Sequence, residues 1–189
     1  MTADIIEMTS ESINRLFDDS STAIAKDLKL NLKKLLTEGA LSPEEASLTL
    51  LATATSLEFP YLIELANQRL AALQISSEQI QEARETAALM GMLNIYYRFR
   101  HMIKEGQGQE AEQRYKMTGL RMNSMARPVL GKVLFEMLSL AVSVLNGCAM
   151  CINAHEQTLR NEQVSDEKIH DLVRLASVVN AVKTLKYSM

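Results

Sequence analysis

Helix-start signals recur along this chain, and they limit its fold more than any other feature. Ser42-Pro43-Glu44-Glu45 is a capping box with proline at the first helical position. Ser76 and Ser165 each precede an acidic first turn and apolar residues at helical spacing. The chain contains only 7 glycines and 3 prolines, and no run of β-branched and aromatic residues alternates with period two. The sequence therefore predicts an all-α fold.

The helix signals form two similar series. In chain order they predict helices over residues 42–57, 60–73 and from 77 onward, and then over 136–145, 148–161 and from 166 onward. Ser76 and Ser165 correspond at an offset of 89 residues, whereas Glu45 and Glu136 correspond at an offset of 91. The two offsets predict that the second series is about two residues shorter, or has a shifted join.

We interpret the two series as two related three-helix units within a single domain of residues 1–189. The units span about 42–104 and 130–187. The stretch 105–127 between them is polar and contains three of the glycines. It is therefore expected to be a connecting region with at most a short helix.

Composition excludes several classes of function. The hydrophobic content of 47% is typical of a globular protein, and a net charge of −3 without a long basic run argues against a nucleic-acid partner. The first residues, 1–7, lack the basic and apolar regions of a secretory signal. No apolar segment approaches the roughly 18 residues of a membrane span. We therefore expect a soluble cytoplasmic protein that binds neither nucleic acid nor membrane.

The two cysteines of the chain, Cys148 and Cys151, lie three residues apart, and His155 follows four residues later. On an α-helix these three positions share one stripe. A break at Asn146-Gly147 puts both cysteines in the first turn of a helix, where unpaired N–H groups and the helix dipole favour a thiolate. His155 can take a proton from Cys151 or pair with its anion. In the cytoplasm, such a CxxC pair is typical of redox or metal chemistry.

Glu136 lies 12 residues before Cys148. In one straight helix this spacing would turn it about 120° away from the cysteine stripe. If the chain folds back at Asn146-Gly147, the carboxylate returns to the site and can orient His155 or relay a proton. Otherwise Glu136 is a solvated residue near a helix start.

Two other interpretations of the cysteine pair stay open at this point. Buried cysteines often act only as small hydrophobic side chains. Two thiolates, the imidazole of His155 and the carboxylate of Glu136 could also hold a zinc ion. However, structural zinc sites usually combine two separated ligand pairs, and the chain has no second CxxC and no HxxxH.

These residues resemble the alkyl hydroperoxidase D (AhpD) family, within the carboxymuconolactone decarboxylase-like group. The family signature is a glutamate followed about twelve residues later by CxxC-x3-H. It stands here as Glu136, Cys148, Cys151 and His155, and further stretches similar to family segments are 26–32, 90–98, 119–123 and 146–160. Known members carry a second histidine immediately before the second cysteine, where this chain has Met150.

The resemblance implies an AhpD-like helical subunit that assembles as a homotrimer and holds no bound cofactor. It implies a thiol peroxidase that reduces alkyl hydroperoxides, takes electrons from a dihydrolipoyl group of a lipoylated protein, and can reduce a partner peroxiredoxin. The first alternative is an adaptor that passes reducing equivalents between these two proteins without consuming peroxide. The second is a zinc-stabilised helical binding module.

The resemblance also implies a role for each site residue. Cys151 is the peroxide-attacking thiol that becomes a sulfenic acid, and Cys148 donates a proton and then closes the disulfide. Glu136 and His155 complete the proton relay. The residues alone leave the attacking cysteine open, because the helix dipole acts most strongly on Cys148, whereas His155 is placed best for Cys151.

Overall fold

The computed structural model describes residues 3–18 and 21–187. Within these residues the chain forms helices and no strand, which confirms the all-α prediction. The elements, in chain order, are α1 (Ala3–Leu16), α2 (Ala23–Thr37), α3 (Pro43–Ser56), α4 (Pro60–Ala72), α5 (Ser77–Gln107), α6 (Gln109–Gln113), the 3-10 helix η1 (Asn123–Ala126), α7 (Lys132–Leu145), α8 (Ala149–Asn161) and α9 (Asp166–Tyr187). No helix in the described residues is long and apolar enough to cross a membrane.

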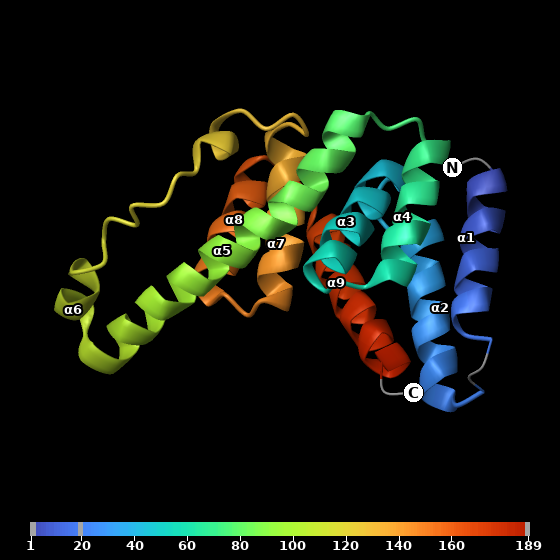
Figure 1. The fold of residues 1–189 in the computed structure, drawn as a ribbon, viewed down its shortest axis with the longest axis horizontal. Coiled ribbons are helices and arrows are strands. Elements are labelled where there is room, and N and C mark those ends of the chain that lie inside the picture. The colour runs from blue at the N-terminus through green and yellow to red at the C-terminus, as the bar shows by residue number, and fades with distance from the viewer. Residues whose placement is uncertain (1–2, 19–20, 188–189) are drawn as a thin grey trace.

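Two helices, α3 and α7, form the centre of the molecule. Every residue of α3 from Ala46 to Ala54 is buried, and α7 is buried from Met137 to Ser143. These two helices pack against each other, and the long helices α5 and α9 each pack against both of them (Figure 1). A helix that is apolar on all sides needs neighbours on all sides, which explains this central position.

The N-terminal helices cover one side of this centre. Helix α1 packs on α2 and α4, and α2 lies against α9. Both are amphipathic, with Ile13 of α1 and Leu32 of α2 fully buried, and the side chain of Thr22 caps the start of α2. Neither helix was predicted from the sequence, whose clear helix-start signals begin at Ser42.

Corresponding helices of the two predicted series lie the same number of residues apart throughout. Helices α7 and α8 begin and end 89 residues after α3 and α4, and α9 begins 89 residues after α5. The offset of 91 for Glu45 and Glu136 is therefore wrong, and no residues are lost between the copies. The predicted start of the fourth helix at residue 136 was also late: α7 begins after Gly131, whose positive φ of 77° suits glycine.

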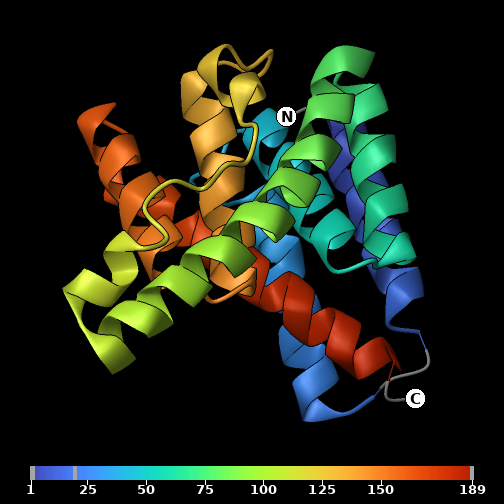
Figure 2. The same cartoon turned by 60° about the vertical axis from the view of Figure 1, so that its left-hand side comes forward.

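Helix α5 extends beyond the rest of the molecule. It has 31 residues and continues through Gly106, so the predicted connecting region at 105–127 starts later than expected. After the short α6, the chain returns along α5 through η1 to the start of α7 (Figure 2). Met122 directly precedes η1 and Met125 belongs to it, and both are partly buried against the core. The returning segment therefore forms part of the wall beside α8.

Candidate active site

The turn between α7 and α8 places the two cysteines. Helix α7 ends at Leu145, and Gly147 adopts a φ of 63°, a left-handed conformation that suits glycine. The N–H of Cys148 then donates to the carbonyl oxygen of Ser143 at 3.2 Å, which closes the turn. Cys148 is the residue that caps α8, and the N–H of Cys151 donates to its sulfur at 3.4 Å. The break predicted at Asn146-Gly147 is confirmed.

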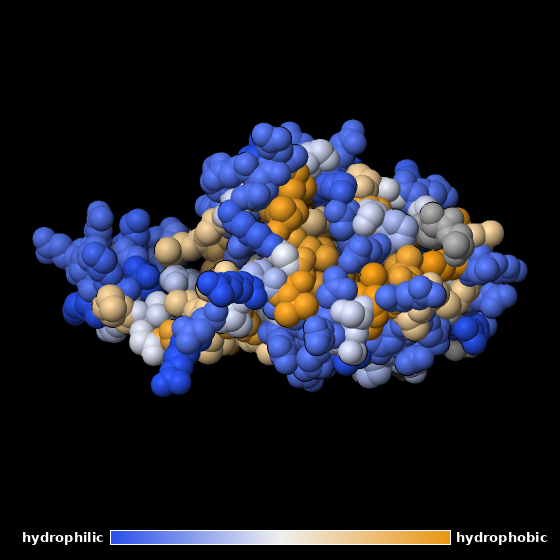
Figure 3. All heavy atoms as spheres, turned by 90° about the horizontal axis from the view of Figure 1, so that it is seen from above, coloured by the Kyte–Doolittle hydropathy of each residue, from blue (hydrophilic) through white to orange (hydrophobic). Residues whose placement is uncertain are grey.

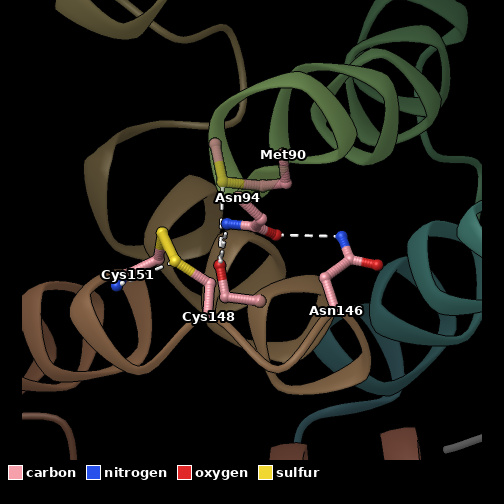
Figure 4. The surroundings of a disulfide bond; sticks show 6 residues. Met90, Asn94, Asn146, Cys148 and Cys151 are labelled. Carbon is pink, nitrogen blue, oxygen red and sulfur yellow. Dashed lines mark hydrogen bonds between the residues drawn. A yellow bond between two sulfur atoms is a disulfide. The ribbon is translucent and has the colours of Figure 1, made fainter. Parts of the chain in front are cut away.

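Cys148 and Cys151 form a disulfide, with 5.3 Å between their Cα atoms (Figure 4). Both are buried: Cys148 is 1% exposed and Cys151 is 7% exposed. The shared helical stripe that the spacing predicted therefore brings the two sulfur atoms into covalent contact. The cysteine pair is therefore in its oxidised form.

A buried network of amide and hydroxyl groups ties this turn to α5. The side-chain amide of Asn94 donates to Ser143 Oγ at 2.9 Å, and Asn146 donates to Asn94 Oδ1, also at 2.9 Å. Ser143 Oγ in turn contacts the sulfur of Met90 at 3.9 Å (Figure 4). Such a satisfied buried network fixes the turn before Cys148 against α5. No role was predicted for Asn94, whose only signal in the sequence is an amide on an otherwise apolar helix face.

The fold-back at Asn146-Gly147 brings Glu136 to His155. Helices α7 and α8 pack against each other, and Glu136 Oε2 lies 2.6 Å from His155 Nδ1. The Glu136 side chain is 16% exposed and that of His155 is 10% exposed. Glu136 is therefore a partly buried partner of the imidazole and not a solvated residue near a helix start. A carboxylate on one ring nitrogen fixes the orientation of the ring.

Lys132, near Glu136, pairs with Glu162. The hydrogen bond to Glu162 is the main reason that the pKa of Lys132 is raised above its ordinary value, and the negative charge of Glu136 adds to this rise. Lys132 Nζ lies 2.6 Å from Glu162 Oε1 and is exposed. This ion pair links α7 to the end of α8 at the outer edge of the site.

A cavity of about 300 Å³ lies beside the disulfide, and Cys151 and His155 form part of its wall. The remaining lining residues come from α5, α8 and the segment around η1; they are Met90, Leu93, Asn94, Tyr97, Met122, Met125, Met150 and Ala154. The contribution of Met122 and Met125 had no sequence signal, because both lie in a segment that was interpreted as a connection.

The described residues contain no group of three or more His, Cys, Asp or Glu side chains arranged to hold a metal ion. The other two histidines lie elsewhere. His101 is 3.2 Å from Glu105 on the exposed part of α5, and His170 lies in a cleft between α2 and α9. The structure thus groups Glu136, His155, Cys151 and Cys148, and leaves the remaining histidines outside the site.

Comparison with known proteins gives matches over most of the chain. Residues 114–189 match the model of the carboxymuconolactone decarboxylase family. The relatives include proteins named alkyl hydroperoxide reductase AhpD from three bacteria. The one from Frankia alni is 41% identical over 93% of this chain and 89% of its own length. The one from Anaeromyxobacter dehalogenans (strain 2CP-C) is 38% identical over 83% of this chain and 81% of its own length. The one from Coxiella burnetii (strain RSA 493) is 38% identical, with coverages of 88% and 92%.

Proposed function

Because this chain belongs to the AhpD family of alkyl hydroperoxide reductases, we propose that it is a thiol peroxidase acting through Cys148 and Cys151. One observation carries the proposal. Cys151 of the Cys148–Cys151 disulfide and His155 both line one cavity. Nδ1 of His155 lies 2.6 Å from Oε2 of Glu136. A dithiol beside a held imidazole is the arrangement that thiol redox chemistry requires.

The first step is attack of the Cys151 thiolate on the O–O bond of the hydroperoxide. The sulfur takes the outer oxygen and becomes a sulfenic acid, while the alkoxide leaves and takes up a proton to become an alcohol. His155 is one helical turn from Cys151 and shares the cavity wall with it. Because Nδ1 of His155 contacts Glu136, Nε2 is the nitrogen that would exchange the proton.

In the second step Cys148 attacks the sulfenic sulfur of Cys151, and water leaves as the disulfide forms. The distance of 5.3 Å between the Cα atoms of the two cysteines supports this step, because cysteines at that separation can be joined by a disulfide. Cys148 at the helix start would also be the better leaving thiolate when the disulfide is reduced again, since the helix N-terminus stabilises negative charge.

Re-reduction then requires an outside dithiol. We propose a dihydrolipoyl group of a lipoylated protein as the donor: one of its thiolates attacks Cys151, and the second closes the lipoyl ring as both cysteines become thiols. Cys151 is the more exposed of the two cysteines, which supports attack at its sulfur. The reduced pair could pass its electrons on to a partner peroxiredoxin. No cofactor would be bound permanently.

The adaptor is the second candidate, and Met150 is the observation that favours it. Methionine cannot relay a proton, and it stands beside Cys151 where AhpD relatives carry a histidine. An adaptor would use the same disulfide but would depend on the peroxiredoxin to consume peroxide.

One assay separates the two functions. The purified protein is mixed with dihydrolipoamide and cumene hydroperoxide, with no other protein present. Consumption of the hydroperoxide with turnover supports the peroxidase. Reduction of the disulfide by dihydrolipoamide without loss of hydroperoxide would contradict the peroxidase and favour the adaptor.

We also propose that the chain assembles as a homotrimer. An exposed apolar stripe on α5 supports a contact between copies; it includes Ile95, 63% exposed, and Met102, 66% exposed. Seen from above, hydrophobic surface gathers in a band near the middle of the molecule and in a second area to the right of it, while the projecting left-hand end is mostly hydrophilic (Figure 3). Light scattering measures the mass directly: Ile95→Lys should lower it, whereas Met117→Lys should not. A monomeric wild-type protein would contradict the proposal.

A further inference from the structure

A cavity of about 460 Å³ lies where α3, α5 and the end of α7 meet, and it shares no lining residue with the cavity beside the disulfide. The apolar part of its wall consists of Ala87, Ala88, Gly91, Ile95 and Leu145. A Cβ added at Gly91 would meet no atom within 4 Å, so the cavity is open at this point of α5. Its volume falls within the range of small-molecule sites.

Two polar atoms on this wall lack hydrogen-bond partners. The hydroxyl of Thr55 and Nε of Arg98 are inaccessible to solvent, and neither forms a hydrogen bond within the described part of the chain. Arg100, two residues further along α5, pairs with Glu112 at 2.6 Å, whereas no carboxylate of the described residues pairs with Arg98. A buried donor costs free energy unless an acceptor pairs with it, so these two donors indicate a ligand that carries one.

The chemistry of the wall favours a carboxylate as this acceptor. A carboxylate can accept two parallel hydrogen bonds from Nε and one Nη of Arg98, and the hydroxyl of Thr55 can donate a further one. Among the described residues, no acidic side chain lines the cavity, so nothing on the wall repels an anion. The remaining wall is mostly apolar and suits an aliphatic chain.

We propose that this cavity binds a small monocarboxylate with a short apolar chain. Its carboxylate pairs with Arg98 and Thr55, and its chain packs against Gly91 and the other apolar residues of the wall. The proposal does not depend on the proposed peroxidase function. Asn146 connects the two cavities: it lines this one, and its side-chain amide donates at 2.9 Å to Asn94, which lines the cavity beside the disulfide (Figure 4).

Sodium hexanoate tests the site, and hexan-1-ol is the neutral probe with the same chain length. Hexanoate added to the full-length oxidised protein should bind with a Kd below about 1 mM by calorimetry. It should shift the NMR signals of Gly91, Arg98 and the side-chain amide of Asn146. Hexan-1-ol should bind at least about 10-fold more weakly, because it cannot form the charged pair. Equal affinities, shifts at Met150 in place of Gly91, or no binding at about 10 mM hexanoate would overturn the proposal.

Arg98→Gln should weaken hexanoate binding about 10-fold or more, because it removes the charge and the Nε donor together. Thr55→Val should weaken binding about three-fold through loss of the hydroxyl. The matched control is Lys104→Gln, which removes a positive charge from an exposed position of the same helix outside the cavity. Its Kd should stay within about two-fold of wild type. An equal loss in Arg98→Gln and Lys104→Gln would show a general effect of charge and overturn the proposal.

Gly91→Leu should abolish binding by filling the cavity, with both donors retained. Leucine is a better helix former than glycine and the added Cβ meets no atom, so we expect the fold to survive. Gly106→Leu is the matched control, because Gly106 also lies in α5 with open space at its Cβ but outside the cavity. It should bind hexanoate as the wild type does. Unchanged binding in Gly91→Leu would contradict the site.

Light scattering separates a free carboxylate from an acidic side chain of a second copy. Ile95 belongs both to the cavity wall and to the stripe proposed as a contact between copies. Binding of hexanoate with no change in mass supports the small-molecule site. A lower mass for Arg98→Gln, together with no binding of hexanoate to the wild type, would overturn that site and identify the acceptor as a carboxylate of a second copy.

Discussion

Two corners of this molecule have the same backbone and different chemistry. One joins α3 to α4 and the other joins α7 to α8. Phe59 caps α4 with φ −108° and ψ 90°, and Cys148 caps α8 with φ −91° and ψ 91°. The preceding residues, Glu58 and Gly147, both have positive φ. Phe59 N–H donates to the carbonyl of Ala54, as Cys148 N–H does to that of Ser143. The backbone alone therefore does not make a redox site.

The side chains at matched positions decide the difference. With the constant spacing of 89 residues, Phe59 corresponds to Cys148, Leu62 to Cys151, Ala66 to His155 and Ser47 to Glu136. In the first corner all four are buried, and the three apolar ones belong to the hydrophobic core. The first corner is thus filled by packing, whereas the second holds a thiol pair and an imidazole held by a carboxylate.

The covering elements also differ between the two corners. Helix α1 packs on α4, and the buried guanidinium of Arg69 fastens this region by donating to Ser47 Oγ, Thr9 Oγ1 and the Leu36 carbonyl. Helix α8 is instead covered by α5 and the segment around η1, which leave the methionine-lined cavity. Two corners with the same backbone geometry thus hold core packing in one case, and a disulfide beside an imidazole–carboxylate pair in the other.

The largest expected effect comes from Cys151→Ser. If the second corner alone carries chemistry, this change should lower peroxide reduction by at least about 10³-fold, because no other thiolate is placed beside His155. Cys148→Ser should instead allow one turnover and leave a sulfenic acid on Cys151, detected by a sulfenate-trapping reagent. Equal labelling of Cys148 in the Cys151→Ser protein would show that the roles are reversed.

His155→Phe should have the next largest effect. The phenyl ring approximates the shape of imidazole but cannot exchange a proton, so peroxide reduction should slow by about 10²-fold. The fraction of Cys151 present as thiolate at neutral pH should also fall, which the thiolate absorbance of the reduced protein measures over a pH series. Circular dichroism checks that α8 remains folded. Unchanged activity would remove the imidazole from the mechanism.

Glu136→Gln should lower the rate of peroxide reduction less than His155→Phe does, by about 10-fold. The carboxylate contacts His155 and does not line the cavity, so it acts by orienting the ring and stabilising its charge. Glutamine keeps the shape and removes the charge, and the pH profile of kcat/KM should therefore shift along with the fall in rate. A uniform fall in rate without a shift in pH profile would point to a structural role alone. Ser47→Ala, at the matched position of the first corner, should leave the pH profile unchanged.

The smallest effect on activity is expected for the first corner itself. Burial lowers the pKa of Arg69 to about 10, so the guanidinium is still charged at neutral pH. Arg69→Ala removes its three hydrogen bonds and leaves a cavity, which should lower the free energy of unfolding by about 3 kcal/mol. Below the unfolding temperature the peroxidase rate should stay within about two-fold of wild type. Denaturant titration measures the free energy of unfolding. Thr158→Ala, at the matched position on α8, should change stability by less than about 0.5 kcal/mol.

Local sequence signals predicted much of the framework. The capping serines at Ser42 and Ser76 accept hydrogen bonds from the backbone three residues later, as expected. The Asn146-Gly147 break falls where glycine is needed for a positive φ. These features depend on contacts within about five residues along the chain, so composition and spacing are enough to predict them. The helices before residue 42 lacked a signal of comparable strength.

Non-local contacts of the site depend on how the helices pack, so local residue patterns leave them open. Glu136 could be solvated or buried, and only the α7–α8 contact decides between these outcomes. The same holds for Asn94, which is 49 residues from Ser143 in sequence and is bonded to it in the fold. A side-chain pattern on one helix gives no information about which distant helix will face it.

The sequence by itself determined an all-helical chain with Cys148, Cys151 and His155 on one helical stripe, because helical periodicity fixes neighbours three to seven residues apart. Only the tertiary structure decided that Glu136 holds the imidazole and that methionines from three elements enclose a cavity beside the cysteines. Those contacts join residues far apart in the chain, and the packing of α5, α7, α8 and the returning segment brings them together.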